Sequence, residues 1–364
     1  SCALLVRSET SSAPIIATQS PTKKAVELSE CWRLARHSPN ALVLDTCRLH
    51  YPGQERALPP LPVLAAQDLL TAEGYQGPVT LTFEFDIHDM PEQLALVVED
   101  AKRWQILTNS KPCSCEDEGY YIDPSFHPVD IRHAAKPGRN SVELHGEFAP
   151  LKKTSFSLSA LFENIDGVEL ENTYLIGDFA IKAEHSPRTP RPGCISLSPG
   201  FALVREPQHV NTDLILAGYP FFSGTITLAQ SVNLRQLPPD TTAVFRIGDL
   251  NACAATLRVN GHDVGSRCLP PFEWDITQLV REGHNALELD LTNTLRNLLG
   301  PHHRPSGEPD SCWGEGAFKG YALASPANIG QWLAEINQES STWTNDYFCV
   351  PFGAARTQIT LHQI

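Results

Sequence analysis

The chain has 364 residues, of which 41% are hydrophobic and 19% charged, a composition typical of folded globular proteins, and its length favours two domains of about 100 to 200 residues. With 28 basic and 42 acidic residues the formal net charge is −14, and Lys and Arg form no cluster, so the sequence argues against a nucleic-acid partner. No apolar run approaches the roughly 20 residues of a membrane-spanning helix, so we expect no membrane partner.

Residues 1–22 are predicted to be the remnant of a preceding module followed by a linker. The sequence begins with Ser1 and its sole methionine is Met90, so we expect a processed or truncated chain. Residues 3–6 are typical of a final strand, and residues 8–24, rich in Ser, Thr, Ala and Pro, are typical of a linker.

Short strand patterns fill most of the remaining chain. In residues 79–85 apolar and polar side chains alternate, as in a half-buried antiparallel strand. The 29 prolines and 23 glycines are spread along the chain, as turns between many strands would place them. The sequence therefore predicts an all-β fold with few short helices. Further strands are predicted at residues 41–45, 94–99, 141–144, 173–181, 224–228, 243–247, 255–259, 286–291 and 357–361, and helices or turns at 65–72, 276–281 and 329–336.

A proline-rich stretch marks the predicted domain boundary. Residues 186–193 read Ser-Pro-Arg-Thr-Pro-Arg-Pro-Gly, and proline has no N–H to donate to a strand ladder, so we expect no strand there. The predicted organisation is a first β-sandwich at 23–185, a linker at 186–192 and a second β-sandwich at 193–364.

An internal repeat is the strongest organisational signal. Asp130 precedes Gly138 by eight residues, and Asp275 precedes Gly283 by the same spacing. In each half the glycine is followed two residues later by an asparagine and then by a strand pattern. Because two unrelated β-rich stretches rarely share such a spacing, we predict that the two halves share one fold.

The repeat also contains a predicted tight hairpin. Asn260-Gly261 suits the two central positions of a type I′ turn, in which both residues have positive φ. Gly283 is predicted to turn the chain into the next strand, because glycine adopts backbone conformations that other residues resist. In the first half Asn109 is followed by Ser110, which departs from the pattern.

These motifs resemble the sugar-binding-type jelly roll of glycoside hydrolase family 2 enzymes, also called the galactose-binding-like fold. The resemblance covers Val259-Asn260-Gly261, Phe272-x-Trp274-Asp275 and Gly283-His284-Asn285, and it is weaker in the first half. Other stretches are similar to the C-terminal region of large bacterial hydrolases related to the family 106 α-L-rhamnosidases. They are residues 32–34, 39–45, 171–179, 218–224 and 297–303.

The resemblance implies two tandem antiparallel jelly-roll (galactose-binding-like) β-sandwiches from the C-terminal part of a glycoside hydrolase. In such enzymes the catalytic carboxylates lie on a separate upstream (β/α)₈ barrel, and no residue here matches those positions, so we predict no catalytic residues in this chain. The expected partners are the upstream catalytic domain of the same polypeptide and a glycan or oligosaccharide, with rhamnose as the implied sugar. The alternatives are a free-standing lectin-like protein and a purely structural or assembly module.

Three aromatic residues are the candidate carbohydrate-binding residues, because aromatic faces stack on the C–H surfaces of sugars. They are Trp313, Trp343 and Tyr347, all in predicted loops, whereas Trp32, Trp104 and Trp274 fit core positions better.

Metal and cofactor signals are weak. Glu116-Asp117-Glu118 is typical of a solvated loop, and a structural calcium site is the alternative, because calcium takes carboxylate and carbonyl oxygens. His302-His303 lacks identifiable partners for a metal site. No cofactor is predicted with certainty. The ten cysteines are neither dense nor regularly spaced, which leaves both a bacterial-type cytoplasmic and a secreted or periplasmic location open.

Overall fold

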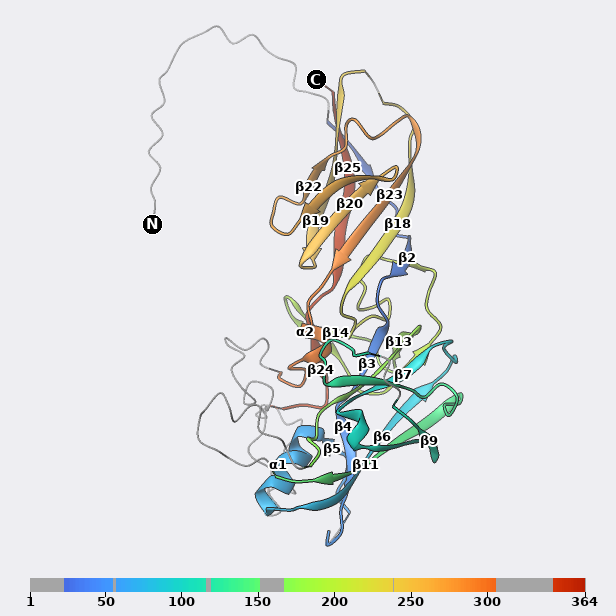
Figure 1. The fold of residues 1–364 in the computed structure, drawn as a ribbon. Coiled ribbons are helices and arrows are strands. Elements are labelled where there is room, and N and C mark those ends of the chain that lie inside the picture. The colour runs from blue at the N-terminus through green and yellow to red at the C-terminus, as the bar shows by residue number, and fades with distance from the viewer. Residues whose placement is uncertain are drawn as a thin grey trace, which may run out of the picture.

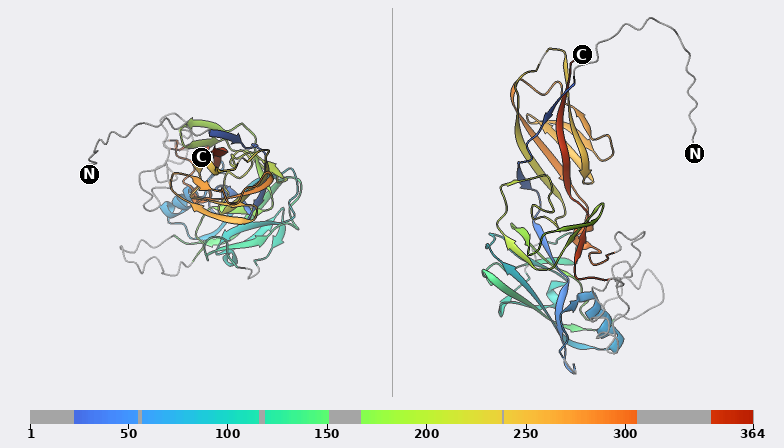
Figure 2. Two further views of the ribbon diagram at one scale, coloured as in Figure 1. Left: turned by 90° about the horizontal axis from the view of Figure 1, so that it is seen from above. Right: turned by 180° about the vertical axis from the view of Figure 1, so that it is seen from behind.

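The computed structural model describes residues 23–54, 57–115, 119–150, 167–237, 239–305 and 343–363. Strands dominate these residues and helices are few and short, which confirms the predicted all-β class. Two β-rich halves lie end to end and give the molecule an elongated shape (Figure 1, Figure 2). In the part of the chain that the structure describes, no helix has both the length and the apolar character needed to cross a membrane.

The first sandwich, drawn lower in Figure 1, has two main sheets. One has the strand order β10-β7-β12-β3, and the other contains β4-β6-β11-β8-β9. The helix α1 (Val63–Glu73) covers the predicted helix at 65–72 and ends at Gly74, which adopts the left-handed conformation. The elements of this half are β3 (Asn40–Leu44), β4 (Thr46–His50), β5 (Leu61–Pro62), β6 (Gly77–Ile87), β7 (Leu94–Glu99), the 3₁₀ turn η1 (Ala101–Arg103), β8 (Gln105–Thr108), β9 (Lys111–Cys113), β10 (Phe126–Asp130), β11 (Gly138–Phe148), β12 (Thr173–Gly177), β13 (Ala180–Ala183) and β16 (Phe201–Val204).

The second sandwich has sheets of matching order. One is β22-β19-β25-β1, and the other contains β2-β18-β23-β20-β21, with β17 beside β2. Its strands are β1 (Lys23–Glu27), β2 (Trp32–Arg36), β17 (His209–Val210), β18 (Thr225–Leu234), β19 (Thr241–Asn251), β20 (Ala254–Val259), β21 (His262–Arg267), β22 (Glu273–Asp275), β23 (Gly283–Thr292) and β25 (Gly353–Gln363).

The two halves repeat one strand plan. Taken in chain order, β3, β4, β6, β7, β8, β9, β10, β11 and β12 occupy the same sheet positions as β1, β2, β18, β19, β20, β21, β22, β23 and β25. This agrees with the fold repeat expected from the sequence. However, β1 pairs with β25 and β2 with β18, so strand pairing joins residues 23–36 to the C-terminal half, across the limits predicted at 23–185 and 193–364. The first sandwich therefore lies in sequence between the second and third strands of the other.

A small sheet between the halves corrects one expectation. Residues 186–193 were predicted to carry no strand, but β14 (Arg188–Arg191) pairs with β15 (Cys194–Leu197), which pairs in turn with β24 (Tyr347–Cys349). β14 is the outer strand of this sheet and its register is irregular, so Pro190 can sit there without a donated N–H. The helix α2 (Arg296–Leu299) lies beside this sheet (Figure 1).

The predicted hairpin turn is confirmed, and the first half contains the same turn. Asn260 and Gly261 have φ of 51° and 81°, as a type I′ turn between β20 and β21 requires. Asn109 and Ser110, between β8 and β9, have φ of 51° and 64°, so a serine adopts the conformation that glycine adopts in the second half.

A pair of asparagines fixes each turn to the next strand. In the second half, Asn285 Oδ1 accepts hydrogen bonds from Arg281 N (2.9 Å) and from Asn260 Nδ2 (2.9 Å). Asn285 Nδ2 donates to the carbonyls of Arg281 (2.7 Å) and Gly283 (3.1 Å). We call this the asparagine lock. The first half has the same lock, in which Asn140 bonds the backbone of Lys136 and Gly138 and accepts from Asn109.

Candidate functional site

A cleft at the junction between the two sandwiches is the candidate site. Its volume is about 480 Å³, and it is formed by the segment that joins β2 to β3, the segment that precedes β7, and the ends of β10 and β12. Four segments far apart in sequence thus meet at one place. The lining residues are Arg36, His37, Ser38, Pro39, Glu92, Gln93, Leu94, Ala95, Asp130, Arg132, Ile176 and Gly177.

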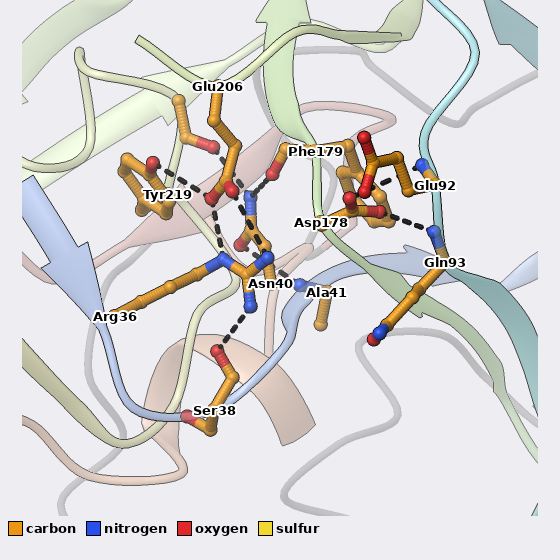
Figure 3. A network of polar contacts seen from close by, with 11 residues as sticks. Arg36, Ser38, Asn40, Ala41, Glu92, Gln93, Asp178, Phe179, Glu206 and Tyr219 are labelled. Carbon is orange, nitrogen blue, oxygen red and sulfur yellow. Dashed lines mark hydrogen bonds and ion pairs between the residues drawn. The ribbon is translucent and has the colours of Figure 1, made fainter. Parts of the chain in front are cut away.

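An ion pair fixes one wall of the junction cleft (Figure 3). Arg36 bonds both carboxylate oxygens of Glu206, at 2.5 and 3.1 Å, and its third nitrogen donates to Ser38 O at 2.9 Å. Tyr219 OH donates to the same carboxylate at 3.1 Å. Burial raises the pKa of Tyr219, and the carboxylate of Glu206 raises it further, so Tyr219 keeps its proton. The bidentate pair holds the segment after β2 in one conformation.

Two further side chains fix the backbone at the other wall (Figure 3). The fully buried Asn40 donates to the carbonyls of Phe179 and Gly218, both at 2.9 Å. Asp178 accepts the backbone N–H groups of Gln93 (2.7 Å) and Glu92 (3.2 Å). The segment that precedes β7 is therefore held by a carboxylate, and the cleft is formed before any ligand arrives.

Gly177 allows the closest backbone approach in the cleft. A Cβ atom built on Gly177 would lie 2.2 Å from the carbonyl oxygen of Gln93, a distance that two such atoms cannot keep. We expect Gly177→Ala to lower the free energy of unfolding by roughly 1–3 kcal/mol, because the segment at Gln93 must move. Urea unfolding of the variant measures this loss.

Gly248→Ala is the matched control for Gly177→Ala. A Cβ atom on Gly248 would lie 2.8 Å from Nε and 2.9 Å from Cβ of Arg356, so its nearest contacts are side-chain atoms rather than a backbone carbonyl oxygen. The loss in Gly248→Ala should therefore be smaller than the loss in Gly177→Ala. Equal losses in the two variants would contradict the role assigned to Gly177.

Several polar groups in the junction cleft have unused hydrogen-bonding capacity. Arg132 Nε donates to Pro91 O at 2.7 Å, but no carboxylate in the described part of the chain forms an ion pair with its guanidinium. The side chains of Glu92 and Gln93 are exposed and make no hydrogen bond to a described residue. Apolar atoms of Pro39 and Ile176 lie among them. Such a surface offers both donors and acceptors beside apolar patches.

Two of the three predicted carbohydrate-binding aromatics lie away from the junction cleft. Trp343 and Tyr347 are 5% and 6% exposed and pack around His303, whose ring stacks on Trp343 at a centroid distance of 4.4 Å. Trp313 and the acidic run at 116–118 lie outside the described residues. Glycan contact by Trp313, Trp343 and Tyr347 therefore stays a prediction.

The cluster around His303 is a buried ion pair, which we name the Asp45 cluster. His303 Nε2 bonds Asp45 Oδ2 at 2.8 Å, and Tyr347 OH donates to Asp45 Oδ1 at 2.7 Å. His303 Nδ1 faces the carbonyls of Thr344 and Asp346. Because both ring nitrogens face acceptors, the imidazolium form satisfies both. Across the described ranges, no group of three His, Cys, Asp or Glu side chains is arranged to hold a metal ion.

Sequence reasoning missed both Asp45 and Arg132. Asp45 was assigned to the end of a strand and Arg132 to no element. A charged residue directly after the apolar run at 41–44 was the available signal for a buried ion pair.

Comparisons with known proteins find only partial similarity to solved structures, at low TM-scores. No protein-family profile and no curated protein sequence matches the chain. Among solved structures, it is similar to a rhamnosidase from Novosphingobium sp. PP1Y, with 16% identity, a TM-score of 0.28, and coverage of 78% of this chain and 23% of that one. It is also similar to the Streptomyces avermitilis α-L-rhamnosidase complexed with L-rhamnose (10%, TM-score 0.30, 72% and 25%) and to a β-glucuronidase from Ruminococcus gnavus (12%, TM-score 0.29, 75% and 46%).

The chain thus spans between about a quarter and a half of the length of these structures. Its structural neighbours are glycoside hydrolases, matched over part of their length and at low similarity, and no single family is established.

Proposed function

We propose that this chain is a non-catalytic accessory region of a glycoside hydrolase and that it binds carbohydrate in the junction cleft. The observation that carries the proposal is a preformed cleft in which the side chains of Glu92 and Gln93 make no hydrogen bond to a described residue and the guanidinium of Arg132 forms no ion pair with one. A volume of about 480 Å³ lies within the range of small-molecule sites, which is roughly 300–1,000 Å³.

The chemistry of the junction cleft suits hydroxyl groups. The guanidinium of Arg132 can donate to two neighbouring hydroxyl oxygens, and the carboxylates of Glu92 and Asp130 can accept from hydroxyl protons. Positive and negative side chains stand together, so the cleft favours a neutral polyol over an ion. Pro39 and Ile176 offer apolar contact for the C–H face of a sugar ring.

The finer parts of the proposal rest on sequence resemblance. They are the galactose-binding-like jelly-roll identity of both sandwiches, rhamnose as the sugar, and an upstream catalytic barrel in the same polypeptide. In this arrangement the two sandwiches support the catalytic domain and hold the glycan near it.

The test measures sugar binding to the isolated chain by calorimetry, with L-rhamnose and with the strongest ligands from a glycan array. Loss of the charged donor in Arg132→Ala should weaken binding about tenfold or more, since a hydrogen bond to a charged group contributes about 1.5–3 kcal/mol. Arg235→Ala removes an exposed arginine outside the cleft and should leave binding unchanged.

Two outcomes would overturn parts of the proposal. Absence of binding to every glycan, or equal affinity in the Arg132→Ala variant, would favour a purely structural module. Turnover of nitrophenyl glycosides, including the rhamnoside, by the isolated chain would contradict its non-catalytic assignment.

A further inference from the structure

A second hollow lies on the first sandwich, away from the junction cleft. It has a volume of about 800 Å³ and is lined by residues from the starts of β6 and β8 and the end of β11. The hollow lies at the start of β6, and none of its lining residues also lines the junction cleft. We call it the sheet-face hollow.

The same sheet face differs between the two sandwiches in the side chains that it carries. The residue five places after the lock asparagine is Asp290 in the second sandwich and His145 in the first. The residue two places before the turn asparagine is Arg258 in the second sandwich and Leu107 in the first. The two sheets thus place different side chains at equivalent positions.

In the second sandwich these positions form a closed network. Arg258 donates to Glu288 (2.8 Å) and twice to Asp290 (2.6 and 2.9 Å). Asp290 also accepts from Thr227 at 2.6 Å. Burial would raise the pKa of Asp290, but the bonds from Arg258 and Thr227 outweigh it and lower the pKa. The polar side chains on this face of the second sandwich therefore hydrogen-bond to one another.

In the first sandwich the same face is open. Leu107 brings no guanidinium, and His145 bonds Thr80 Oγ1 (3.0 Å) and Glu143 Oε2 (3.1 Å) instead. The side chains of Gln105 and Glu147 line the hollow, are exposed, and make no hydrogen bond or ion pair to a described residue. These groups remain available to a ligand.

The rest of the lining is amphipathic. Arg103 donates to Gly167 O at 2.6 Å, which fixes the rim, and Pro78 and Val168 contribute apolar surface. The amide of Gln105 and the carboxylate of Glu147, beside apolar patches, match a ring that carries hydroxyl groups on an apolar frame. Arg103 and Glu147 bring opposite charges to the lining, so an ionic ligand gains little.

We propose that the sheet-face hollow is a second saccharide site, which takes a neutral oligosaccharide through the side chains of Gln105 and Glu147. It shares the ligand class of the proposed function but uses none of the residues of the junction cleft. One glycan of sufficient length, or two branches, can then engage both hollows, and the two contacts together raise the apparent affinity.

The experiment is an NMR titration of the ¹⁵N-labelled chain with neutral hexasaccharides (cellohexaose, xylohexaose and a rhamnose-containing hexasaccharide) and with hexagalacturonate. We expect shifts of the backbone amide signals of residues 79–80 and 145–147 with a neutral probe and weaker shifts with hexagalacturonate. The double variant Gln105→Ala/Glu147→Ala should weaken this binding at least tenfold. Thr256→Ala, at the position in the second sandwich equivalent to Gln105, is the matched control and should bind as the parent does.

The outcomes separate this inference from the proposed function. If Arg132→Ala removes shifts at the junction cleft while those at 79–80 and 145–147 persist, both hollows bind independently, as proposed. If saturating neutral probe shifts only the junction cleft, or if Thr256→Ala weakens binding as much as the double variant, the sheet-face hollow is not a saccharide site. Neither of these results bears on the proposal that the junction cleft binds carbohydrate.

Discussion

The variants Asn140→Ala and Asn285→Ala are each expected to lower the free energy of unfolding by about 3 kcal/mol. Both side chains are buried, at 1% and 0% exposed, and each bonds one N–H and two carbonyls of the turn that leads into its strand. Alanine removes all these partners at once and leaves buried backbone groups unpaired. Chemical unfolding followed by fluorescence measures the loss.

Asn233→Ala is the matched control, because Asn233 lies on β18 with an exposed side chain. The free energy of unfolding of this variant should fall by no more than about 0.5 kcal/mol. The two locks lie in different sandwiches, so their effects should add in the double variant. If unfolding occurs in two steps, each variant should shift one step only, and losses under 1 kcal/mol would contradict the structural role of the locks.

The locks explain why the repeat could be read from the sequence. Each lock is local: Asn140 and Asn285 bond backbone groups two and four residues before them, so the spacing from aspartate to glycine to asparagine is preserved in both halves. The hairpin at Asn260 is equally local. Ser110 was harder to interpret, because a serine adopts positive φ less readily than a glycine, so Asn109-Ser110 does not signal the turn as Asn260-Gly261 does.

The nesting of one sandwich within the other left no local signal. β1 and β25 are paired although more than 300 residues separate them, as in Val26 opposite Ile359, and neither strand specifies its partner. The small sheet that contains Pro190 also left no local signal. Its strand β15 pairs with β24, which lies far along the chain, as in Ile195 opposite Cys349. Sequence order placed residues 23–36 with the strands that follow them, whereas pairing joins them to the C-terminal half.

The candidate sites show the same limit. Trp343 and Tyr347 were selected as ligand contacts because their neighbours in sequence are polar, but the residue that Tyr347 bonds is Asp45, 302 positions away. The junction cleft combines four segments, and no motif in any of them indicates a sugar. Only the tertiary structure shows which polar groups, such as the guanidinium of Arg132, remain without an ionic partner.

Asp45→Asn is expected to lower the free energy of unfolding by about 3–5 kcal/mol, the cost of removing one partner from a buried ion pair. Asp45 and His303 are 5% and 6% exposed, and the asparagine amide offers one acceptor oxygen where the carboxylate accepts from both His303 and Tyr347. Tyr347→Phe loses one hydrogen bond to a carboxylate that keeps His303, so its loss should be smaller, about 1–3 kcal/mol. Unfolding at pH 7 compares the two variants, and a larger loss in Tyr347→Phe would contradict the assignment.

The pH dependence of stability provides a separate test of the Asp45 cluster. Burial would raise the pKa of Asp45, but the charge and hydrogen bond of His303, with the bond from Tyr347, hold it below the ordinary 3.8. The unfolded chain then binds the proton more readily, so this stability is present above pH 3.8 and is lost as the pH falls through the folded pKa. In Asp45→Asn this loss of stability at acid pH should disappear.

Two other groups act at higher pH and oppose each other. Burial lowers the pKa of His302 from 6.5 to about 4, so stability falls as the pH drops through that window. Burial, with Glu169, raises the pKa of Glu99 from 4.5 to about 7, so stability rises as the pH drops from 7 to 4.5. We therefore expect a shallow pH profile between 4.5 and 6.5 in the parent chain. In Glu99→Gln the opposing contribution is gone, and the profile should slope downward toward acid, because the titration of His302 is then no longer offset.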